Sequence, residues 1–237
     1  MHSIKITILL FFTGTALAVA DSPPIDGDIY KPTFLFADDS LTAGTAFLVG
    51  GKAQNILVTC HHLFGPDGGL QQQRSPDDIV QQIHGAVALS MKDQTTILQA
   101  PVYLKVADAF PLDAKDYSKD LALFVVASPA NAKNFKLAAT MPKIGDHVWV
   151  YARLRGTNEA KLFSAIVSEI TSARLRYIFD DPSFNIAGTS GSPVLDQKGE
   201  VVGMNLGGGT TDDKKRVYGA ANPASSISQE IATVLTH

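Results

Sequence analysis

Short apolar segments recur along the whole chain, and Gly, Pro, Asp or Asn residues separate them. The segments are rich in Val, Ile, Phe and Tyr, and we find no internal repeat or heptad pattern. Many short segments of this kind are typical of β-strands in an all-β barrel or sandwich. The expected strands are Thr33–Phe36, Thr45–Val49, Ile56–Thr59, Ala86–Leu89, Thr96–Gln99, Leu121–Val126, His147–Ala152, Leu162–Ile170, Arg174–Phe179, Val194–Leu195, Val201–Met204 and Val217–Ala221.

A helical pattern is clear only at the end of the chain. Ile227, Ile231 and Val234 recur at the spacing of one helix face, and Ser225 or Ser226 can cap the first turn. The pattern predicts a helix over residues 225–236, with its apolar face on the second half of the molecule.

Turn-forming residues also mark the boundaries within the chain. A cluster of Pro and Asn near Ser128–Pro142 indicates the break between two halves. Asp196–Gly199 lies between two apolar pairs and predicts a hairpin turn. Residues 64–84 and 107–119 are polar and rich in turn formers, which predicts surface loops.

The first twenty residues have the pattern of a secretory signal. Lys5 precedes the apolar run Ile6–Phe12, and Ala18–Ala20 supplies the small residues that signal peptidase requires. The alternative is a membrane anchor, but the run is shorter than the roughly 20 apolar residues of a spanning helix. We therefore expect removal of residues 1–20, a mature chain of residues 21–237 and no membrane contact after cleavage.

Composition narrows the classes of partner and compartment. The net charge is −3 and the isoelectric point is about 6.0, so there is no basic excess that would suggest nucleic-acid binding. The single cysteine, Cys60, cannot form an intramolecular disulfide, and its apolar surroundings predict a small buried residue. An exported chain without disulfides indicates bacterial-type export to the periplasm or the medium.

Three segments carry residues suited to acyl transfer. The segment Leu57–Leu63 is a β segment that runs straight into His61 and His62. Asp120 leads into a strand, and Ser190 lies between Gly188 and Gly191. A serine hydroxyl is a weak nucleophile until a base takes its proton, which a histidine can do near neutral pH. A carboxylate on the other ring nitrogen orients that base.

Gly188 is suited to a second task at the same site. It allows a tight turn in which its own N–H and that of Ser190 point together at the developing oxyanion. We therefore predict an oxyanion hole from the backbone of Gly188 and Ser190. Asp108, Asp113 and Asp116 are rivals to Asp120, but they lie in a polar segment that does not lead into a strand.

The three segments together resemble the signatures of trypsin-like peptidases. These signatures are Val-Thr-Cys-His-His at His62, Asp-Leu-Ala-Leu at Asp120 and Gly-Thr-Ser-Gly-Ser-Pro-Val at Ser190. The region from Gly188 to Gly208 is most similar to bacterial glutamyl endopeptidases. The resemblance implies an all-β, chymotrypsin-like fold of two six-stranded antiparallel β-barrels, over about residues 30–128 and 142–224, followed by the helix.

The same resemblance implies the activity and the residues that perform it. It implies a serine endopeptidase that acts on protein or peptide substrates through His62, Asp120 and Ser190, and the signal at residues 1–20 predicts that it is exported. We also expect a monomer and no cofactor. It also implies a specificity pocket with walls from 184–187, 205–208 and 217–221. The residues expected to bind substrate there are Asn205, Gly207 and Gly219.

Two departures from the family pattern change what can be expected. Thr189 stands where animal digestive enzymes carry an aspartate that pairs with the freed N-terminus. Asn205 stands where glutamyl endopeptidases carry a histidine that reads the substrate carboxylate, so acidic specificity does not follow. The walls of the expected pocket carry no charge, which favours neutral side chains before the scissile bond.

Other interpretations of the same residues stay open. A catalytically silent binding module would keep the fold without turnover, and a serine esterase would use the same triad on another substrate. The pair His61 and His62 could suggest a metal site, but we expect their side chains to alternate as the strand ends, so we predict no metal. His147 is expected at the edge of the second barrel, without a chemical role.

Overall fold

The computed structural model describes residues 21–50, 54–111, 116–127 and 132–236, so the predicted signal at 1–20 lies outside the described residues. Seven strands form the first sheet, in which β2 adds to the outside of β1. The other six form the cycle β1-β3-β4-β7-β6-β5, which β1 and β5 close by pairing along their length. The strands are β1 (Ile29–Phe36), β2 (Ser40–Thr42), β3 (Ala46–Gly50), β4 (Asn55–Thr59), β5 (Ile83–Ser90), β6 (Ile97–Leu104) and β7 (Ala122–Ala127).

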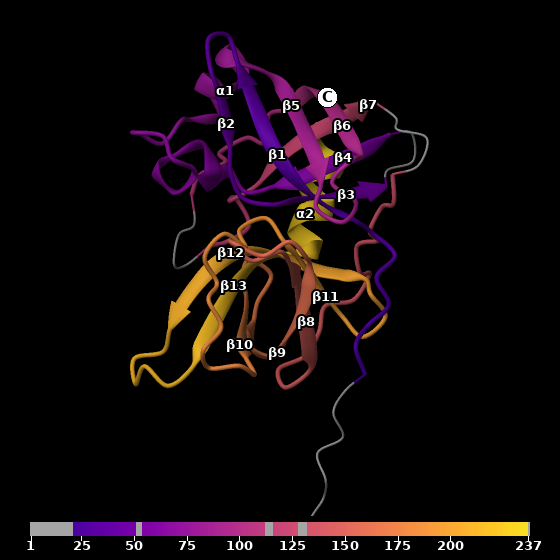
Figure 1. Ribbon diagram of the computed structural model, residues 1–237, viewed down its shortest axis with the longest axis vertical. Helices are drawn as coiled ribbons and strands as arrows, with labels where there is room; N and C mark the ends of the chain where they lie inside the picture. The colour runs from indigo at the N-terminus through magenta and orange to yellow at the C-terminus, as the bar shows by residue number, and fades with distance from the viewer. Residues whose placement is uncertain (1–20, 51–53, 112–115, 128–131, 237) are drawn as a thin grey trace, which may run out of the picture.

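The second half forms another closed barrel, in the order β10-β13-β12-β11-β8-β9. Figure 1 shows the two barrels stacked, with the first above the second. The predicted all-β fold of two six-stranded antiparallel barrels and a C-terminal helix is therefore confirmed. The strands are β8 (His147–Ala152), β9 (Lys161–Ile170), β10 (Leu175–Phe179), β11 (Pro193–Leu195), β12 (Val201–Thr210) and β13 (Val217–Pro223).

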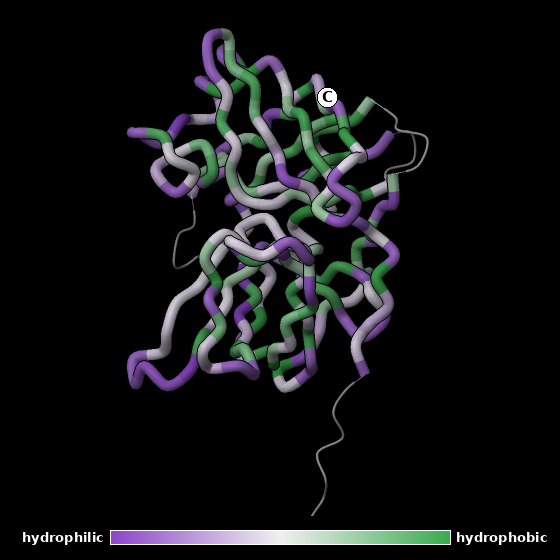
Figure 2. The backbone as a smooth tube through the Cα atoms, in the orientation of Figure 1, coloured by the Kyte–Doolittle hydropathy of each residue, from purple (hydrophilic) through white to green (hydrophobic). Residues whose placement is uncertain are grey.

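Each barrel closes around an apolar interior. Along β10 burial alternates residue by residue, as expected for a strand with one face inside the barrel. In the first barrel the ring of Phe34 packs against Phe64 and Phe124, at centroid distances of 4.5 and 5.8 Å. Figure 2 shows hydrophobic residues along the strands of both barrels and hydrophilic residues at the outer end of the β12–β13 hairpin.

The C-terminal helix α2 (Ala224–Val234) begins one residue earlier than expected and joins the two barrels. It contacts β12 and β13, while Ile227 lies in the core cluster that fills the first barrel and the interface. The predicted serine cap is wrong: Pro223 precedes the helix with extended backbone and provides no side-chain cap. No helix in the described part of the chain is long and apolar enough to cross a membrane.

The segment 64–84 is not only a loop, contrary to expectation. It contains a short 3-10 helix, η2 (Pro66–Gly68), and the α-helix α1 (Pro76–Gln82). Ser75 forms a capping box with Asp78, and Pro76 occupies the first turn, where its missing N–H leaves no bond unmade. This start signal was present in the sequence, but the helix is too short to show apolar periodicity.

Several strands extend beyond the expected segments, and β6 and β12 do so through proline or glycine. β6 continues past Pro101 to Leu104, with a register shift against β7 between Gln99 and Val102. β12 continues through the glycine run 207–209, with a register shift against β13 between Asn205 and Gly207. Proline and glycine are depleted in strands except at edges and bulges, so these residues do not themselves favour a strand. Pairing with the neighbouring strands therefore determines these extensions.

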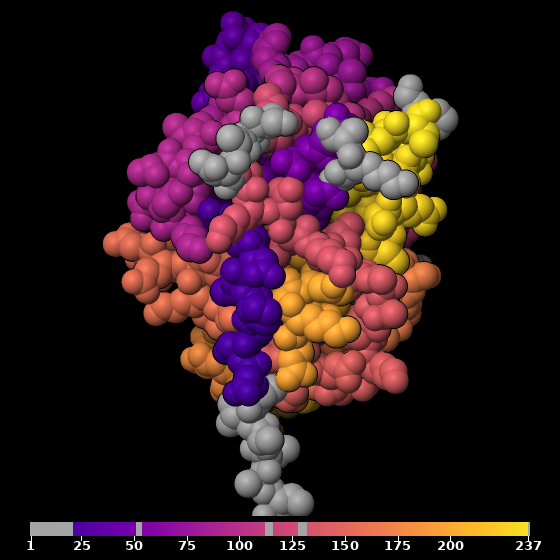
Figure 3. All heavy atoms as spheres, turned by 90° about the vertical axis from the view of Figure 1, so that its right-hand side faces the viewer, coloured from indigo at the N-terminus to yellow at the C-terminus, as the bar shows by residue number. Residues whose placement is uncertain are grey.

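The segment that precedes β1 lies along the second barrel before the chain enters the first. Figure 3 shows this segment, which begins at Asp21, on the surface of the lower barrel. Pro24 contacts Gly199 in the β11–β12 turn so closely that a Cβ at Gly199 would lie 2.2 Å from the Pro24 carbonyl oxygen. Gly199 has φ of +78° and donates to the Asp196 carbonyl, so the hairpin turn predicted at Asp196–Gly199 is confirmed.

Candidate active site

The predicted base lies at the end of β4, where the chain turns into a 3-10 helix, η1 (His61–Phe64). His61 and His62 are 1% and 4% exposed, so both side chains are buried. The expectation that they alternate across the end of a strand is wrong, because helical backbone begins at His61. The His61 ring lies 6.1 Å from that of Phe64, and its Nδ1 has no hydrogen-bond partner in the described structure.

Asp120 is the acid that meets His62. It is fully buried just before β7, and its two oxygens contact the histidine at two points. Oδ1 accepts the backbone N–H of His62 at 2.9 Å, and Oδ2 lies 2.7 Å from the ring Nδ1. This double contact determines the orientation of the imidazole and leaves Nε2 for the reacting partner. Of the rival acids, Asp113 lies outside the described residues.

The electrostatic environment favours a protonatable imidazole. Burial disfavours the charged ring of His62, but the hydrogen bond and negative charge of Asp120 outweigh it, with a contribution from Asp67. The pKa of His62 is therefore raised above its ordinary value. His61 differs, because burial lowers its pKa and outweighs the opposing negative charge of Asp120 and a backbone hydrogen bond with Arg74. Of the two histidines, only His62 is equipped to hold a proton during a reaction.

Ser190 lies in the loop between β10 and β11, and backbone contacts fasten this loop to the first barrel. Its carbonyl oxygen accepts the Thr45 N–H at 2.8 Å. Thr59, three residues before His62, donates its hydroxyl to the Thr45 carbonyl at 2.7 Å. Thr45 therefore links the serine loop to the strand that carries the histidine.

The hydroxyl of Ser190 faces the second barrel in this structure. Its Oγ donates to the Leu206 carbonyl at 3.2 Å, so the proton is not directed at His62. A serine side chain changes rotamer by rotation about one bond, on a timescale far shorter than enzymatic turnover. The Leu206 contact therefore describes one rotamer of Ser190 and does not fix the direction of its hydroxyl.

Two glycines give the serine loop its shape. Gly188 and Gly191 have φ of +85° and +86°, in the region that disfavours other residues. At Gly191 a Cβ would also lie 1.9 Å from the Thr45 carbonyl oxygen. In the described part of the chain, neither the backbone N–H of Gly188 nor that of Ser190 donates a hydrogen bond. Both predicted oxyanion donors are therefore uncommitted.

A neutral hydrogen-bond network, which we call the Asn205 bracket, supports the loop from below. Asn205 is fully buried, and its Nδ2 donates to the carbonyl and to the hydroxyl of Thr189 at 3.0 and 2.8 Å. The Tyr177 hydroxyl donates to Asn205 Oδ1 at 2.6 Å. Burial raises the pKa of Tyr177 well above its ordinary value, which keeps this donor protonated.

The Asn205 bracket changes the interpretation of two predicted residues. Asn205 was expected to bind substrate, but protein groups occupy both ends of its amide. Thr189 replaces the charged aspartate of animal relatives with a neutral hydroxyl, which itself donates to the Ile186 carbonyl at 2.6 Å. Sequence reasoning missed Tyr177 entirely, because a tyrosine in a strand gives no signal of the partner it meets across a barrel.

The other predicted substrate residues line the region beside this bracket. At Gly219 a Cβ would lie 2.1 Å from the Tyr177 ring, so only glycine fits against that face. Gly208 lies against Ile186, while Gly207 has open space beside its Cα and φ of +131°. Phe184 packs on Phe179 at 4.1 Å between ring centroids. These surroundings are uncharged, as the sequence suggested.

Two members of the candidate triad also belong to a set of residue types that can bind a metal. Ligand atoms of Cys60, His62 and Asp120 lie within 4.8 Å of one another. The Nδ1 of His62 is already bonded to Asp120, and the Cys60 thiol points to the Asn205 carbonyl at 3.5 Å. Burial raises the pKa of that thiol well above its ordinary value, which disfavours the thiolate that a metal requires. The donor chemistry therefore fits a triad better than a metal site.

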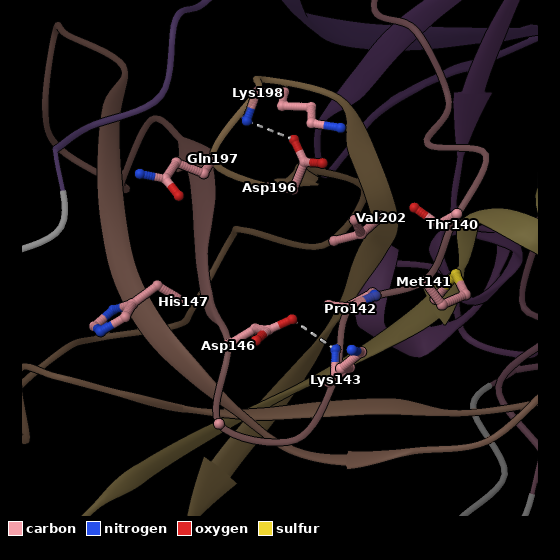
Figure 4. Close-up of a pocket in the computed structure, with 11 residues that line it drawn as sticks. Thr140, Met141, Pro142, Lys143, Asp146, His147, Asp196, Gln197, Lys198 and Val202 are labelled. Carbon is pink, nitrogen blue, oxygen red and sulfur yellow. Dashed lines mark hydrogen bonds between the residues drawn. The ribbon is translucent and has the colours of Figure 1, made fainter.

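A large cavity, of about 780 Å³, lies away from these residues. It opens on the second barrel between the 140–147 segment and the β11–β12 turn (Figure 4). Asp146 accepts from the Lys143 N–H and Asp196 from the Lys198 N–H, so these carboxylates serve local turns. His147 lies exposed at its rim, at the edge of the barrel as expected.

Comparison with known proteins agrees with this geometry. No curated protein matches the chain in sequence. The Rv3671c protease of M. tuberculosis in its active form superimposes with a TM-score of 0.57 at 17% identity, covering 96% of this chain and 94% of that one. The serine endoprotease of Yersinia pestis gives 0.59 at 13% identity, covering 90% of this chain and 64% of that one.

These identities are low, so the two structures establish only the likeness of fold. The subtype resemblance to glutamyl endopeptidases stays a prediction. A family model described as a trypsin-like peptidase domain matches residues 44–204, which is more than half of the chain and includes His62, Asp120 and Ser190. The chain belongs to the trypsin-like peptidase family.

Proposed function

We propose that the chain is an exported serine endopeptidase with Ser190 as nucleophile, His62 as base and Asp120 as the group that orients the base. The observation that carries this proposal is the buried two-point contact between His62 and Asp120. A carboxylate buried against an imidazole is costly to desolvate, and a structural role alone does not require it. The export that we propose depends on the predicted signal at residues 1–20.

The proposed reaction begins with the rotation of Ser190 Oγ away from the Leu206 carbonyl. His62 Nε2 takes the hydroxyl proton as Oγ attacks the substrate carbonyl carbon, and Asp120 stabilises the imidazolium. The uncommitted N–H groups of Gly188 and Ser190 donate to the oxyanion. The C–N bond then breaks as His62 returns the proton to the leaving amine. Water attacks the resulting ester by the same path and frees Ser190.

The test pairs a covalent probe with digestion of a peptide library. The protein that begins at Asp21 should react with a fluorophosphonate and cleave internal peptide bonds, while Ser190→Ala should do neither and keep the same melting temperature. We expect neutral residues before the scissile bond, because none of the described wall residues at 184–187, 205–208 and 217–221 carries a charge. Substantial turnover by Ser190→Ala would refute the assignment.

A second candidate is a catalytically silent binding module. The contact of Ser190 Oγ with the Leu206 carbonyl favours it, since that contact keeps the hydroxyl from the base. This candidate predicts peptide binding without probe labelling. A serine esterase would label with the probe and leave every peptide of the library intact.

A further inference from the structure

A second cavity, of about 640 Å³, begins next to the serine loop. Gly188, two residues before Ser190, and Gly44 both line it, and a Cβ at Gly44 would be 3.0 Å from the Ser190 backbone carbonyl oxygen. The cavity includes no residue of the walls expected for the specificity pocket. Because residues before the scissile bond are expected in those walls, this cavity is available to residues after that bond.

The charges on this cavity have mainly one sign. Its charged lining residues are Lys31 on β1, Arg153 and Arg155 after β8, and Asp67 on η2. The three cations exceed the single acid in a chain whose net charge is −3. Within the described parts of the chain, Lys31, Arg153 and Arg155 form no ion pair. An unneutralised cluster of this kind is a local feature that the overall composition does not predict.

The arrangement is unfavourable without an anion. Lys31 and Arg153 are both half-buried, and among the described residues the Lys31 Nζ donates only to the Gly44 carbonyl, at 2.9 Å. Burial, and then the neighbouring charge of Arg153, lowers the pKa of Lys31. Like charges held together in partly desolvated surroundings repel each other. A carboxylate between these cations would neutralise the repulsion and would accept hydrogen bonds from their N–H groups.

We propose that this cavity binds an acidic side chain of the substrate, within the first few residues after the scissile bond. The specificity-determining residues are Lys31, Arg153 and Arg155. This inference rests on the proposed peptidase function and deepens it. The two sides of the scissile bond are then read differently, with neutral residues before it and a carboxylate after it. Arginine suits the task, because its planar guanidinium binds a carboxylate through two parallel hydrogen bonds.

The first experiment compares kcat/KM for peptides that differ only in Glu or Gln at each of four positions after the scissile bond. We expect about a 10-fold preference for Glu at one or two positions, since these charge-assisted contacts are partly exposed to solvent. In the double variant Arg153→Gln/Arg155→Gln the ratio should fall to about 2. Lys198→Gln removes an exposed cation at the other cavity (Figure 4) and should leave the ratio unchanged.

The second experiment does not need turnover. In the Ser190→Ala background, a labelled peptide with three consecutive Glu residues should bind about 10-fold more tightly than its Gln counterpart, and the double variant should lose this difference. Failure of the chain to cleave any peptide would refute the proposed function, while this measurement still tests the cavity. Each peptide is made both with an amidated and with a free C-terminus, so that binding of a chain-end carboxylate can be distinguished from binding of a side chain.

Several outcomes would overturn the inference. Equal rates and equal binding for Glu and Gln would do so, as would a Glu preference that the double variant keeps at an unchanged melting temperature. A preference present only in peptides with a free C-terminus would assign the cations to the chain end rather than to a side chain. Loss of the ratio in Lys198→Gln would indicate general charge attraction instead of a site.

Discussion

The two halves of the candidate site are held in place by different kinds of interaction. On the first barrel, His62 and Asp120 form a charged contact at two points, with 4% and 0% of their surfaces exposed. On the second barrel, the loop of Ser190 depends on positive-φ glycines and the neutral Asn205 bracket. The proposed base is thus preset and sensitive to pH, while the proposed nucleophile is held by groups that do not titrate near neutrality.

The largest expected effect distinguishes the two adjacent histidines. His62→Ala should lower kcat/KM by about 10⁶-fold, because triad members act as a unit, and adding Ser190→Ala should lower it little further. His61→Ala should mainly reduce stability, since its buried ring packs on Phe64 and its Nδ1 has no partner in the described structure. Turnover and probe labelling at matched folding decide between them. An inactive His61→Ala beside an active His62→Ala would shift the triad by one residue.

The next largest effect concerns the contact between His62 and Asp120 on the first barrel, and the pH dependence of activity tests it. Asp120→Asn keeps the shape of the contact but should lower kcat/KM by about 10⁴-fold. Asp120 raises the pKa of His62, and the imidazole must be neutral to act as base. Activity therefore falls as the pH drops through that pKa. Removing the carboxylate lowers the pKa, so the acid limb of the residual activity should move to lower pH. A limb that stays in place would show that another group controls it.

A third effect compares two glycines of the serine loop. Gly188 and Gly191 have nearly the same φ, but only Gly191 lies against backbone, where the Thr45 oxygen would be 1.9 Å from an added Cβ. Gly188→Ala should therefore reduce the free energy of unfolding by about 1–2 kcal/mol through φ strain alone. Gly191→Ala adds a clash and should reduce it by about 2–5 kcal/mol. Equal losses in denaturant titrations would show that the loop moves freely away from Thr45.

The expected strands could be read from the sequence because each carries its own apolar residues. The residues that support the site from behind could not. Asn205 and Tyr177 are 28 residues apart and meet only because β12 and β10 both pair with β13. The cations Lys31 and Arg153 likewise come from different barrels. These residues come close together only when the barrels close and pack, and the local spacing of residues in the sequence does not predict that.

The short helix α1 shows the opposite kind of error. Its capping box at Ser75 and Asp78 is local and was readable, but seven residues give too little periodicity to outweigh their polarity. For His61 and His62 strand alternation does not apply, because the strand ends where η1 begins. The choice of His62 over His61 therefore depends on the observed contact with Asp120 and not on alternation.

The smallest expected effect concerns the Asn205 bracket on the second barrel. Tyr177→Phe removes the donor to Asn205 Oδ1 and leaves a buried acceptor unpaired, which should reduce the free energy of unfolding by about 1–3 kcal/mol. Tyr103→Phe is the matched control, because the Tyr103 hydroxyl is buried in the first barrel without a partner in the described structure. Its loss should be neutral or stabilising. In Tyr177→Phe the rate should fall at every pH with no shift of the acid limb, since the Asn205 bracket carries no titrating group near neutral pH. A shifted limb would mean that the bracket reaches His62 electrostatically, and the contrast between the two halves would then fail.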